Sequence, residues 1–184
     1  MQPLEYALVA YVRNSVGRFV EDLRREVYPE HAHLPAHITV LPPRRLQGTE
    51  AEGIRNLEEV CAGIEPFELT MDGVETFVPA TPTVYIRVDH GSGRMQELHR
   101  RLNAGVFHCT EQWSYLAHLT IVKLESDALA LHALEHSRRR WEGYRGTRRV
   151  LIDQLTFVRE GPNNRWIDLA QLQLGRDIAP RPDK

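Results

Sequence analysis

The sequence is poor in cysteine and has no long apolar segment. Cys61 and Cys109 are its only cysteines, and two cysteines so far apart form neither a disulfide framework nor a CxxC site. We expect both thiols to be packed as small apolar groups in a reducing cytoplasm. No apolar run approaches the ~18–20 residues that cross a bilayer, and no basic segment precedes the first apolar run. The sequence therefore predicts a cytoplasmic protein without membrane association.

The sequence also lacks a charge excess. Its 23 basic and 25 acidic residues leave a formal net charge of −2, whereas proteins that coat long nucleic acids usually carry a strong basic excess. A short or terminal piece of nucleic acid needs only a local basic groove and stays possible. Neither a GxGxxG nor a GK[ST] phosphate loop is present. With 42% hydrophobic and 26% charged residues in 184, we expect one globular domain spanning 1–184 and a monomer.

One pattern of strands and helices is written twice. Periodicity and turn signals predict strands at 6–12, 37–41, 67–78, 83–88, 118–124, 148–160 and 165–174, and helices at 16–30, 50–64, 92–104 and 127–144. Pro42-Pro43 is expected to end the second strand, and Thr49 and Ser126 are expected to cap the helices at 50–64 and 127–144. Equivalent positions lie about 81 residues apart (118 − 37), which predicts two lobes, roughly 1–80 and 81–175, around a central cleft, with 176–184 as a tail.

Each half contains a histidine and a threonine two positions apart on an expected strand. In "HITV" (37–40) and "HLTI" (118–121), the first and third side chains share one face of the strand, because side chains alternate. The branched apolar residues between them face the opposite way and anchor the strand. One such pair would most simply be a half-exposed polar face, but two at equivalent points of a repeat indicate a shared site.

"AHITVLPP" and "AHLTIVKL" resemble the paired H-x-T-x signatures of the two-histidine (2H) phosphoesterase superfamily, most closely its branch of 2′-5′ RNA ligases and RNA 2′,3′-cyclic phosphodiesterases. The resemblance covers nearly the whole chain. It implies an α+β fold of two pseudo-symmetric lobes, each an antiparallel sheet with helices outside. It also implies catalytic roles for His37, Thr39, His118 and Thr120, and RNA ends or small cyclic or 2′-5′-linked nucleotides as partners.

The implied reaction opens a 2′,3′-cyclic phosphate to a 2′-phosphate, with 2′-5′ RNA ligation as its reverse. Water must lose a proton as it attacks phosphorus, and the leaving ribose oxygen must gain one. Two imidazoles with pKa values near ~6.5 can do both around neutral pH, while threonine hydroxyls donate to the phosphoryl oxygens. No metal or other cofactor is required. The sequence does not assign the roles; for hydrolysis we take His118 as base and His37 as acid.

Seven more residues are candidates for substrate contact. The aromatic ones could stack a base or simply pack in the core, and the basic ones could touch phosphate. They lie at the end of the first strand, at the matching place in the second half, or beside the two motifs. The candidates are Tyr11, Arg13, Tyr85, Arg44, Trp113, Tyr115 and Lys123.

Three alternatives remain open. The cleft could belong to a non-catalytic module that binds RNA ends or nucleotides, and such binding would tolerate loss of either histidine. The substrate could be another cyclic or 2′-5′-linked nucleotide. His31, His33 and His37 could also form a metal-dependent hydrolase site. Zinc sites need four protein ligands, or three and a water molecule, and His31 and His33 belong to a Pro-flanked loop.

Overall fold

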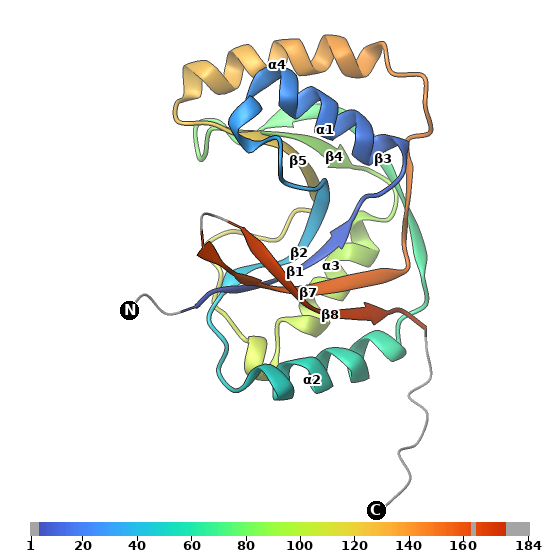
Figure 1. The fold of residues 1–184 in the computed structure, drawn as a ribbon. Coiled ribbons are helices and arrows are strands. Elements are labelled where there is room, and N and C mark those ends of the chain that lie inside the picture. Colours follow the sequence, from blue (N-terminus) through green and yellow to red (C-terminus); the bar gives the residue numbers. More distant parts are fainter. Residues whose placement is uncertain (1–3, 163–164, 176–184) are drawn as a thin grey trace, which may run out of the picture.

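Eight strands form one antiparallel sheet in the order β6-β3-β4-β5-β2-β1-β7-β8 (Figure 1). The computed structural model describes residues 4–162 and 165–175. The strands are β1 Tyr6–Tyr11, β2 His37–Arg44, β3 Phe67–Thr76, β4 Thr83–Val88, β5 His118–Lys123, β6 Arg149–Ile152, β7 Gln154–Glu160 and β8 Trp166–Gln173. The helices are α1 Ser15–Val27, α2 Glu50–Ala62, α3 Ser92–Leu102 and α4 Asp127–Glu142, with short 3-10 turns η1 Pro29–His31 and η2 Gly105–Phe107.

The sheet is folded into two four-stranded halves with helices on their outer faces. We call β6-β3-β4-β5 the β5 half and β2-β1-β7-β8 the β2 half. Helices α1 and α4 pack on the β5 half, and α2 and α3 pack on the β2 half. Figure 1 shows α1 and α4 with the β5 half in the upper part of the view, and α2 with β7 and β8 of the β2 half in the lower part. The expected fold class, an α+β protein of two pseudo-symmetric lobes with helices outside, is confirmed.

The halves of the sheet do not follow the halves of the chain. β3, within 1–80, lies in the β5 half, and β7 and β8, from the end of the chain, lie beside β1. The single strand expected over 148–160 is therefore two, because β6 pairs with β3 while β7 pairs with β1. Asp153 separates them. The GPNN turn partly, and the 176–184 tail entirely, lie outside the described residues.

Helices α1, α2 and α4 begin at polar caps that the sequence supplies. Thr49 and Glu52 form a reciprocal capping box at α2, as the sequence suggests for Thr49. The Ser126 hydroxyl accepts from the Leu129 backbone N–H at α4, also as predicted. Asn14 caps α1 by accepting from the Val16 N–H at 3.0 Å, so this helix starts just before the expected residue 16. Within 4–162 and 165–175, no helix is both long and apolar enough to cross a bilayer.

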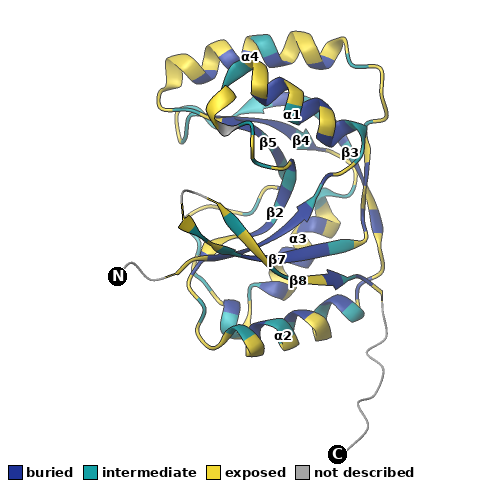
Figure 2. Cartoon of the chain, viewed as in Figure 1, coloured by how far each residue is buried: buried dark blue, intermediate teal, exposed yellow. Residues whose placement is uncertain are grey.

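The two halves of the sheet meet at one residue pair. β2 and β5 are antiparallel neighbours through Ile38 and Leu119, both fully buried. Beyond this pair the strands separate, and Figure 2 shows the buried residues of β2 and β5 at the junction. β2 continues through Pro42 and Pro43 to Arg44 rather than stopping at the prolines. Proline has no backbone N–H to donate. It is tolerated at these positions because β2 no longer pairs with β5 there.

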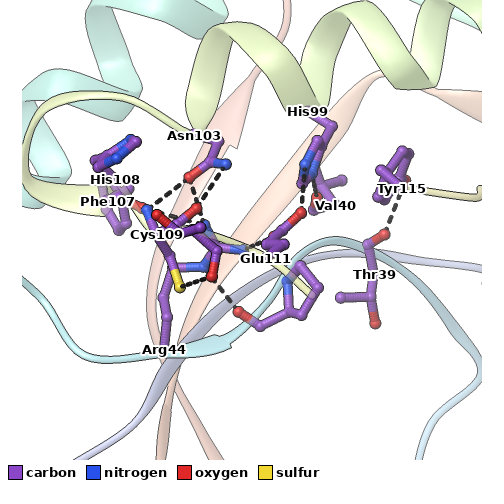
Figure 3. A network of polar contacts seen from close by, with 12 residues as sticks. Thr39, Val40, Arg44, His99, Asn103, Phe107, His108, Cys109, Glu111 and Tyr115 are labelled. Atoms are coloured by element: carbon purple, nitrogen blue, oxygen red, sulfur yellow. Dashed lines mark hydrogen bonds and ion pairs between the residues drawn. The ribbon is translucent and has the colours of Figure 1, made fainter. Parts of the chain in front are cut away.

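A buried ion pair fastens the loop before β5 to β2. The Arg44 guanidinium pairs with Glu111, donates to Asn103 Oδ1 at 2.8 Å and donates to the Phe107 carbonyl at 3.1 Å (Figure 3). The Arg44 side chain is only 2% exposed and that of Glu111 20%. The Asn103 side chain in turn bonds both the N–H and the carbonyl of Cys109. The segment that leads to the second motif is thus held by side-chain hydrogen bonds rather than by a strand.

Replacing Arg44 by methionine should cost about 3 kcal/mol of unfolding free energy, because a mostly buried Glu111 carboxylate would lose its cation. We take the low end of the known range because a fifth of the Glu111 side chain is exposed. Urea denaturation of Arg44→Met measures the loss, and Arg44→Met/Glu111→Gln should recover part of it. A loss under about 1 kcal/mol, or no recovery in the double variant, would contradict this assignment.

Candidate active site

His37 opens β2, and its ring is fixed by the residues just before it. Nδ1 of His37 donates to the Pro35 carbonyl at 2.8 Å. A carbonyl can only accept, so the neutral ring carries its proton on Nδ1 and its lone pair on Nε2. Tyr11, the β1 partner of His37 in the sheet register, meets this ring edge-on at a centroid distance of 6.4 Å.

His118 is held in the same way at the start of β5. Its Nδ1 donates to the Leu116 carbonyl at 2.7 Å, two residues upstream, as in the first motif. The ring lies edge-on to Phe77 at 5.0 Å and to Tyr85 at 5.2 Å. The two imidazoles therefore have the same tautomer and the same anchor, while the aromatic packing is closer around His118.

The strand register brings the two motifs together. With Ile38 opposite Leu119, antiparallel geometry sets His37 opposite Thr120 and Thr39 opposite His118. Both strands show the same alternation, with histidine and threonine half-buried and the residues between them buried. Each histidine thus has the threonine of the other motif across from it. The four residues predicted from the two motifs lie on one face of adjoining strands.

Burial lowers the pKa of both imidazoles. For His37, removal from solvent is the largest cause; the Pro35 carbonyl works against it, and the charges of Arg24 and His118 lower the pKa further. For His118, burial again dominates and the Leu116 carbonyl opposes it. The rings are close enough for His118 to affect the pKa of His37. In the unliganded protein both rings are therefore mostly neutral at pH 7.

A groove of about 770 Å³ runs from His37 and Thr39 over the β2 half. Among the described residues, its lining comes from β1, β2, β7, β8 and neighbouring loops, and none comes from β4 or β5. The floor is apolar, formed by Ala7, Val9 and Val158. The groove is thus built on one side of the histidine pair, although the fold is pseudo-symmetric.

Aromatic and charged side chains surround this floor. Trp166 and Tyr11 pack against it, and the Tyr11 hydroxyl donates to Asp168 Oδ1 at 2.7 Å. Burial and the neighbouring carboxylate raise the pKa of Tyr11, so the hydroxyl keeps its proton. Arg13 and Arg165 also line the groove, and the Arg13 guanidinium lies 5.3 Å from the centroid of the Tyr11 ring. The groove combines aromatic stacking surfaces with two arginine cations and the Asp168 carboxylate.

The remaining predicted contact residues lie in three different settings. Tyr85 is buried against His118 and donates to Glu75 at 3.2 Å. Arg44 and Tyr115 are used inside the fold, which differs from the expected substrate contact: Arg44 pairs with Glu111, and the Tyr115 hydroxyl donates to the Thr39 carbonyl at 2.9 Å. Trp113 and Lys123 are exposed, and neither lines the groove.

Sequence reasoning missed the contribution of the last strand. Trp166 and Asp168 lie two positions apart on β8, and only the β1-β7-β8 pairing brings them beside Tyr11. The sequence does show that Trp166 and Asp168 lie on the same face of their strand, because they are two positions apart, and this was the signal that could have indicated them. Tyr85 was expected at the position of the second half that corresponds to Tyr11. In the sheet Tyr11 pairs with His37, and the residue that pairs with His118 is Arg87 instead. Arg87 is engaged by Asp72 and Glu75.

The histidine-rich loop before β2 is placed only in part. His33 lines the groove, and its Nδ1 lies 3.2 Å from the Glu30 carbonyl. The side chain of His31 lies outside the described part of the structure. Among the described residues, no three His, Cys, Asp or Glu side chains are grouped so as to hold a metal ion.

Comparison with known proteins agrees with this architecture. Residues 12–164 match the family described as the 2′-5′ RNA ligase superfamily. A protein named "Putative phosphoesterase" from Halalkalibacterium halodurans is 22% identical over 175 residues, covering 95% of this chain and 99% of the relative.

Two solved structures share the fold. Escherichia coli LigT, complexed with NADP+, superposes with a TM-score of 0.63 at 15% identity, over 96% of this chain and all of that one. The protein TT0787 of Thermus thermophilus also gives 0.63, at 13% identity, over 95% of this chain and all of that one. The family match spans most of the sequence, including both H-x-T-x motifs. The chain belongs to the 2′-5′ RNA ligase superfamily.

Proposed function

We propose that the protein is a metal-independent phosphodiesterase that hydrolyses the 2′,3′-cyclic phosphate of an RNA end or nucleotide to a 2′-phosphate, working as a cytoplasmic monomer. The observation that carries the proposal is the matched anchoring of two imidazoles. Each Nδ1 donates to a carbonyl two residues upstream, which leaves both Nε2 atoms to exchange protons with a substrate.

The two rings supply a complete proton path. One neutral Nε2 takes a proton from the water molecule as its oxygen attacks phosphorus. The P–O3′ bond breaks, and the imidazolium of the other ring donates its proton to the O3′ leaving group, so that the phosphate remains on O2′. Solvent exchange then restores the starting protonation of both rings. We keep His118 as the base and His37 as the acid in this direction.

The surroundings of the rings suit these roles. Lowered pKa values keep the base neutral near pH 7, and a bound phosphate anion would raise the pKa of the ring that must carry the proton. The Thr39 and Thr120 hydroxyls share the face of the two rings and can donate to the phosphoryl oxygens, whose charge grows in the transition state. Each well-placed proton transfer typically contributes about 10²–10⁴-fold in rate.

The groove supports a nucleotide as substrate. Trp166 offers a stacking surface, Asp168 an acceptor for a ribose hydroxyl or base amine, and Arg13 and Arg165 donors for phosphate. Escherichia coli LigT, which shares the fold, has been solved with 3′-AMP and with phosphate. We infer that the nucleoside of the substrate extends from the histidine pair over the β2 half.

The same site would support 2′-5′ ligation as the reverse reaction, with an RNA 5′-hydroxyl replacing water. A non-catalytic binding module is the contrasting hypothesis, and it predicts nucleotide binding without turnover. Anchoring of both rings favours the enzyme, because mere binding would not need two matched tautomers. Another cyclic or 2′-5′-linked nucleotide would use the same proton transfers.

Loss of either motif histidine should strongly lower turnover. His37→Ala and His118→Ala should each lower kcat on adenosine 2′,3′-cyclic phosphate by about 10²–10⁴-fold, because each removes one proton transfer. The assay is run in EDTA with chromatographic identification of the 2′-phosphate. His132→Ala, at an exposed position of α4, is the matched control and should retain wild-type activity. Full activity in either motif variant, or loss of wild-type activity in EDTA, would refute the mechanism.

The pH optimum of kcat/KM should lie on the acid side of neutrality. Catalysis needs one neutral and one protonated ring, and both pKa values lie below the ordinary value of about 6.5. Above that pH the acid is increasingly deprotonated, so kcat/KM should fall about tenfold per pH unit. A pH profile of kcat/KM from pH 4 to pH 9 measures this. An optimum well above pH 7 would mean that the rings titrate differently.

Removal of the Trp166 ring should weaken nucleotide binding. Trp166→Ala should raise KM by about tenfold, since stacking contributes on the order of 1–3 kcal/mol per base, with kcat changed less. Steady-state kinetics on adenosine 2′,3′-cyclic phosphate measures both. Trp113→Ala, which removes a tryptophan that is 66% exposed and outside the groove, is the control. Equal KM changes in the two variants would argue against nucleotide binding in the groove.

A further inference from the structure

Both motif strands carry a β-bulge immediately after the threonine. In β2, Val9 pairs with Thr39 but Leu8 with Leu41, so Val40 is an extra residue. In β5, Tyr85 pairs with Thr120 but Val84 with Val122, so Ile121 is the extra residue. A bulge disrupts the ladder locally and re-aims side chains, and bulges are frequent beside active sites. Other groups must therefore satisfy and fix the backbone at these two points.

Arg24 of α1 binds the backbone of the bulge in β5. Its Nε donates to the Ile121 carbonyl at 2.8 Å and its Nη2 to the Thr120 carbonyl at 3.0 Å. Its Nη1 donates to the Leu34 carbonyl, in the loop that ends at His37. Arg24 is only 4% exposed. One buried guanidinium thus ties the second motif to the loop that anchors the first.

His99 and Tyr115 bind the backbone of the bulge in β2. Nδ1 of His99 donates to the Val40 carbonyl at 2.7 Å, and the Tyr115 hydroxyl donates to the Thr39 carbonyl at 2.9 Å (Figure 3). The two rings stack at a centroid distance of 4.2 Å and an interplanar angle of 6°. Nε2 of His99 lies 3.0 Å from Glu111, so the pair is connected to the ion pair of Arg44.

The two sets of contacts are reciprocal. Arg24 lies on the helix that precedes β2 and holds the bulge in β5, whereas His99 lies on the helix that precedes β5 and holds the bulge in β2. The bound carbonyls are equivalent, because Thr39 and Val40 match Thr120 and Ile121 in the repeat. Different donors therefore bind equivalent carbonyls in the two halves. We call Arg24, His99 and Tyr115 the cross-brace.

We propose that the cross-brace is a set of positioning residues that fixes the separation and orientation of His37 and His118. The backbone ladder between the halves of the sheet consists of one residue pair, Ile38–Leu119, so few backbone hydrogen bonds fix the angle between β2 and β5. Proton transfer to both sides of one phosphorus atom requires the rings to keep their spacing, and a 1 Å misplacement can cost about 10²-fold in rate. The proposal rests on the proposed phosphodiesterase function for its catalytic readout.

The variants remove donors with little change in shape. Tyr115→Phe removes only the hydroxyl that donates to Thr39 and keeps the ring stack. Arg24→Met removes all donors, and Arg24→Lys restores a cation. The controls are Tyr144→Phe, which loses a hydroxyl bonded at Ser15, and Arg138→Met, which loses a helix arginine that donates to the Val74 carbonyl in β3. Neither control touches a motif strand.

The cross-brace predicts a loss in kcat rather than in KM. Tyr115→Phe should lower kcat about tenfold and Arg24→Met about 10²-fold, with KM within about twofold and partial recovery in Arg24→Lys. Both controls should keep wild-type kcat even at an equal loss of Tm. In Arg24→Met the limb of the pH profile that belongs to His37 should also move to higher pH, because a nearby positive charge is gone. Kinetic losses no larger than those of the controls would overturn the proposal.

A second measurement keeps the inference separate from the proposed function. NMR titration of the imidazole signals of His37 and His118 with inorganic phosphate needs no turnover. In the wild type both signals should shift along one binding curve. In Tyr115→Phe and Arg24→Lys phosphate should still bind within about twofold, but the two imidazole signals should start from changed positions and shift by different amounts, while Tyr144→Phe behaves as the wild type. Imidazole signals in the brace variants that match the wild type with and without phosphate would overturn the cross-brace. Absence of wild-type turnover with these NMR effects intact would overturn only the proposed reaction.

Discussion

The contact between Ile38 and Leu119 is the constraint on which the site depends. It joins the two halves of the sheet and sets the register that places each histidine opposite the threonine of the other motif. Because both side chains are fully buried, the contact is anchored in the hydrophobic core rather than at the surface. The histidines and threonines of the two motifs are the residues adjacent to this apolar pair.

The helices extend that constraint across the molecule. Each of α1 and α3 follows a strand of one half but contacts the other half, α1 against β5 and α3 against β2. Residues on these helices can therefore reach the opposite motif, as Arg24 and His99 do. Both helices pack on the opposite half because the same β-α-β connection occurs twice in the chain, as β1-α1-β2 and as β4-α3-β5. Pseudo-symmetry thus gives the cleft two equivalent supports of different chemistry.

The groove over the β2 half departs from this symmetry. Its floor of small apolar residues needs β7 and β8 beside β1, and Trp166 and Asp168 come from the last strand. On the other side of the histidine pair, Phe77 and Tyr85 pack directly on His118. Under the proposed function, a site with one open and one filled side would receive a nucleotide in one direction, and this would give two similar imidazoles different roles.

Local patterns were sufficient to predict the two motifs, most elements and the caps at Thr49 and Ser126, because each depends on neighbours in the sequence. The division of the strand at Asp153, the passage of β2 through Pro42-Pro43 and the groove at Trp166 depend on which strands pair, and no local pattern carries that information. The same holds for Arg44, whose charge is used by Glu111 from a distant loop.

The interleaved strand order has a consequence for how the protein is made. β1 pairs with β7 through contacts such as Tyr6 with Arg159. This side of β1 can therefore form its strand pairing only after nearly the whole chain has been synthesised. Such distant pairings favour slow folding, and during synthesis both motif histidines emerge well before β7 and β8. The nascent chain thus contains both motif histidines before it has the β7-β8 wall of the groove.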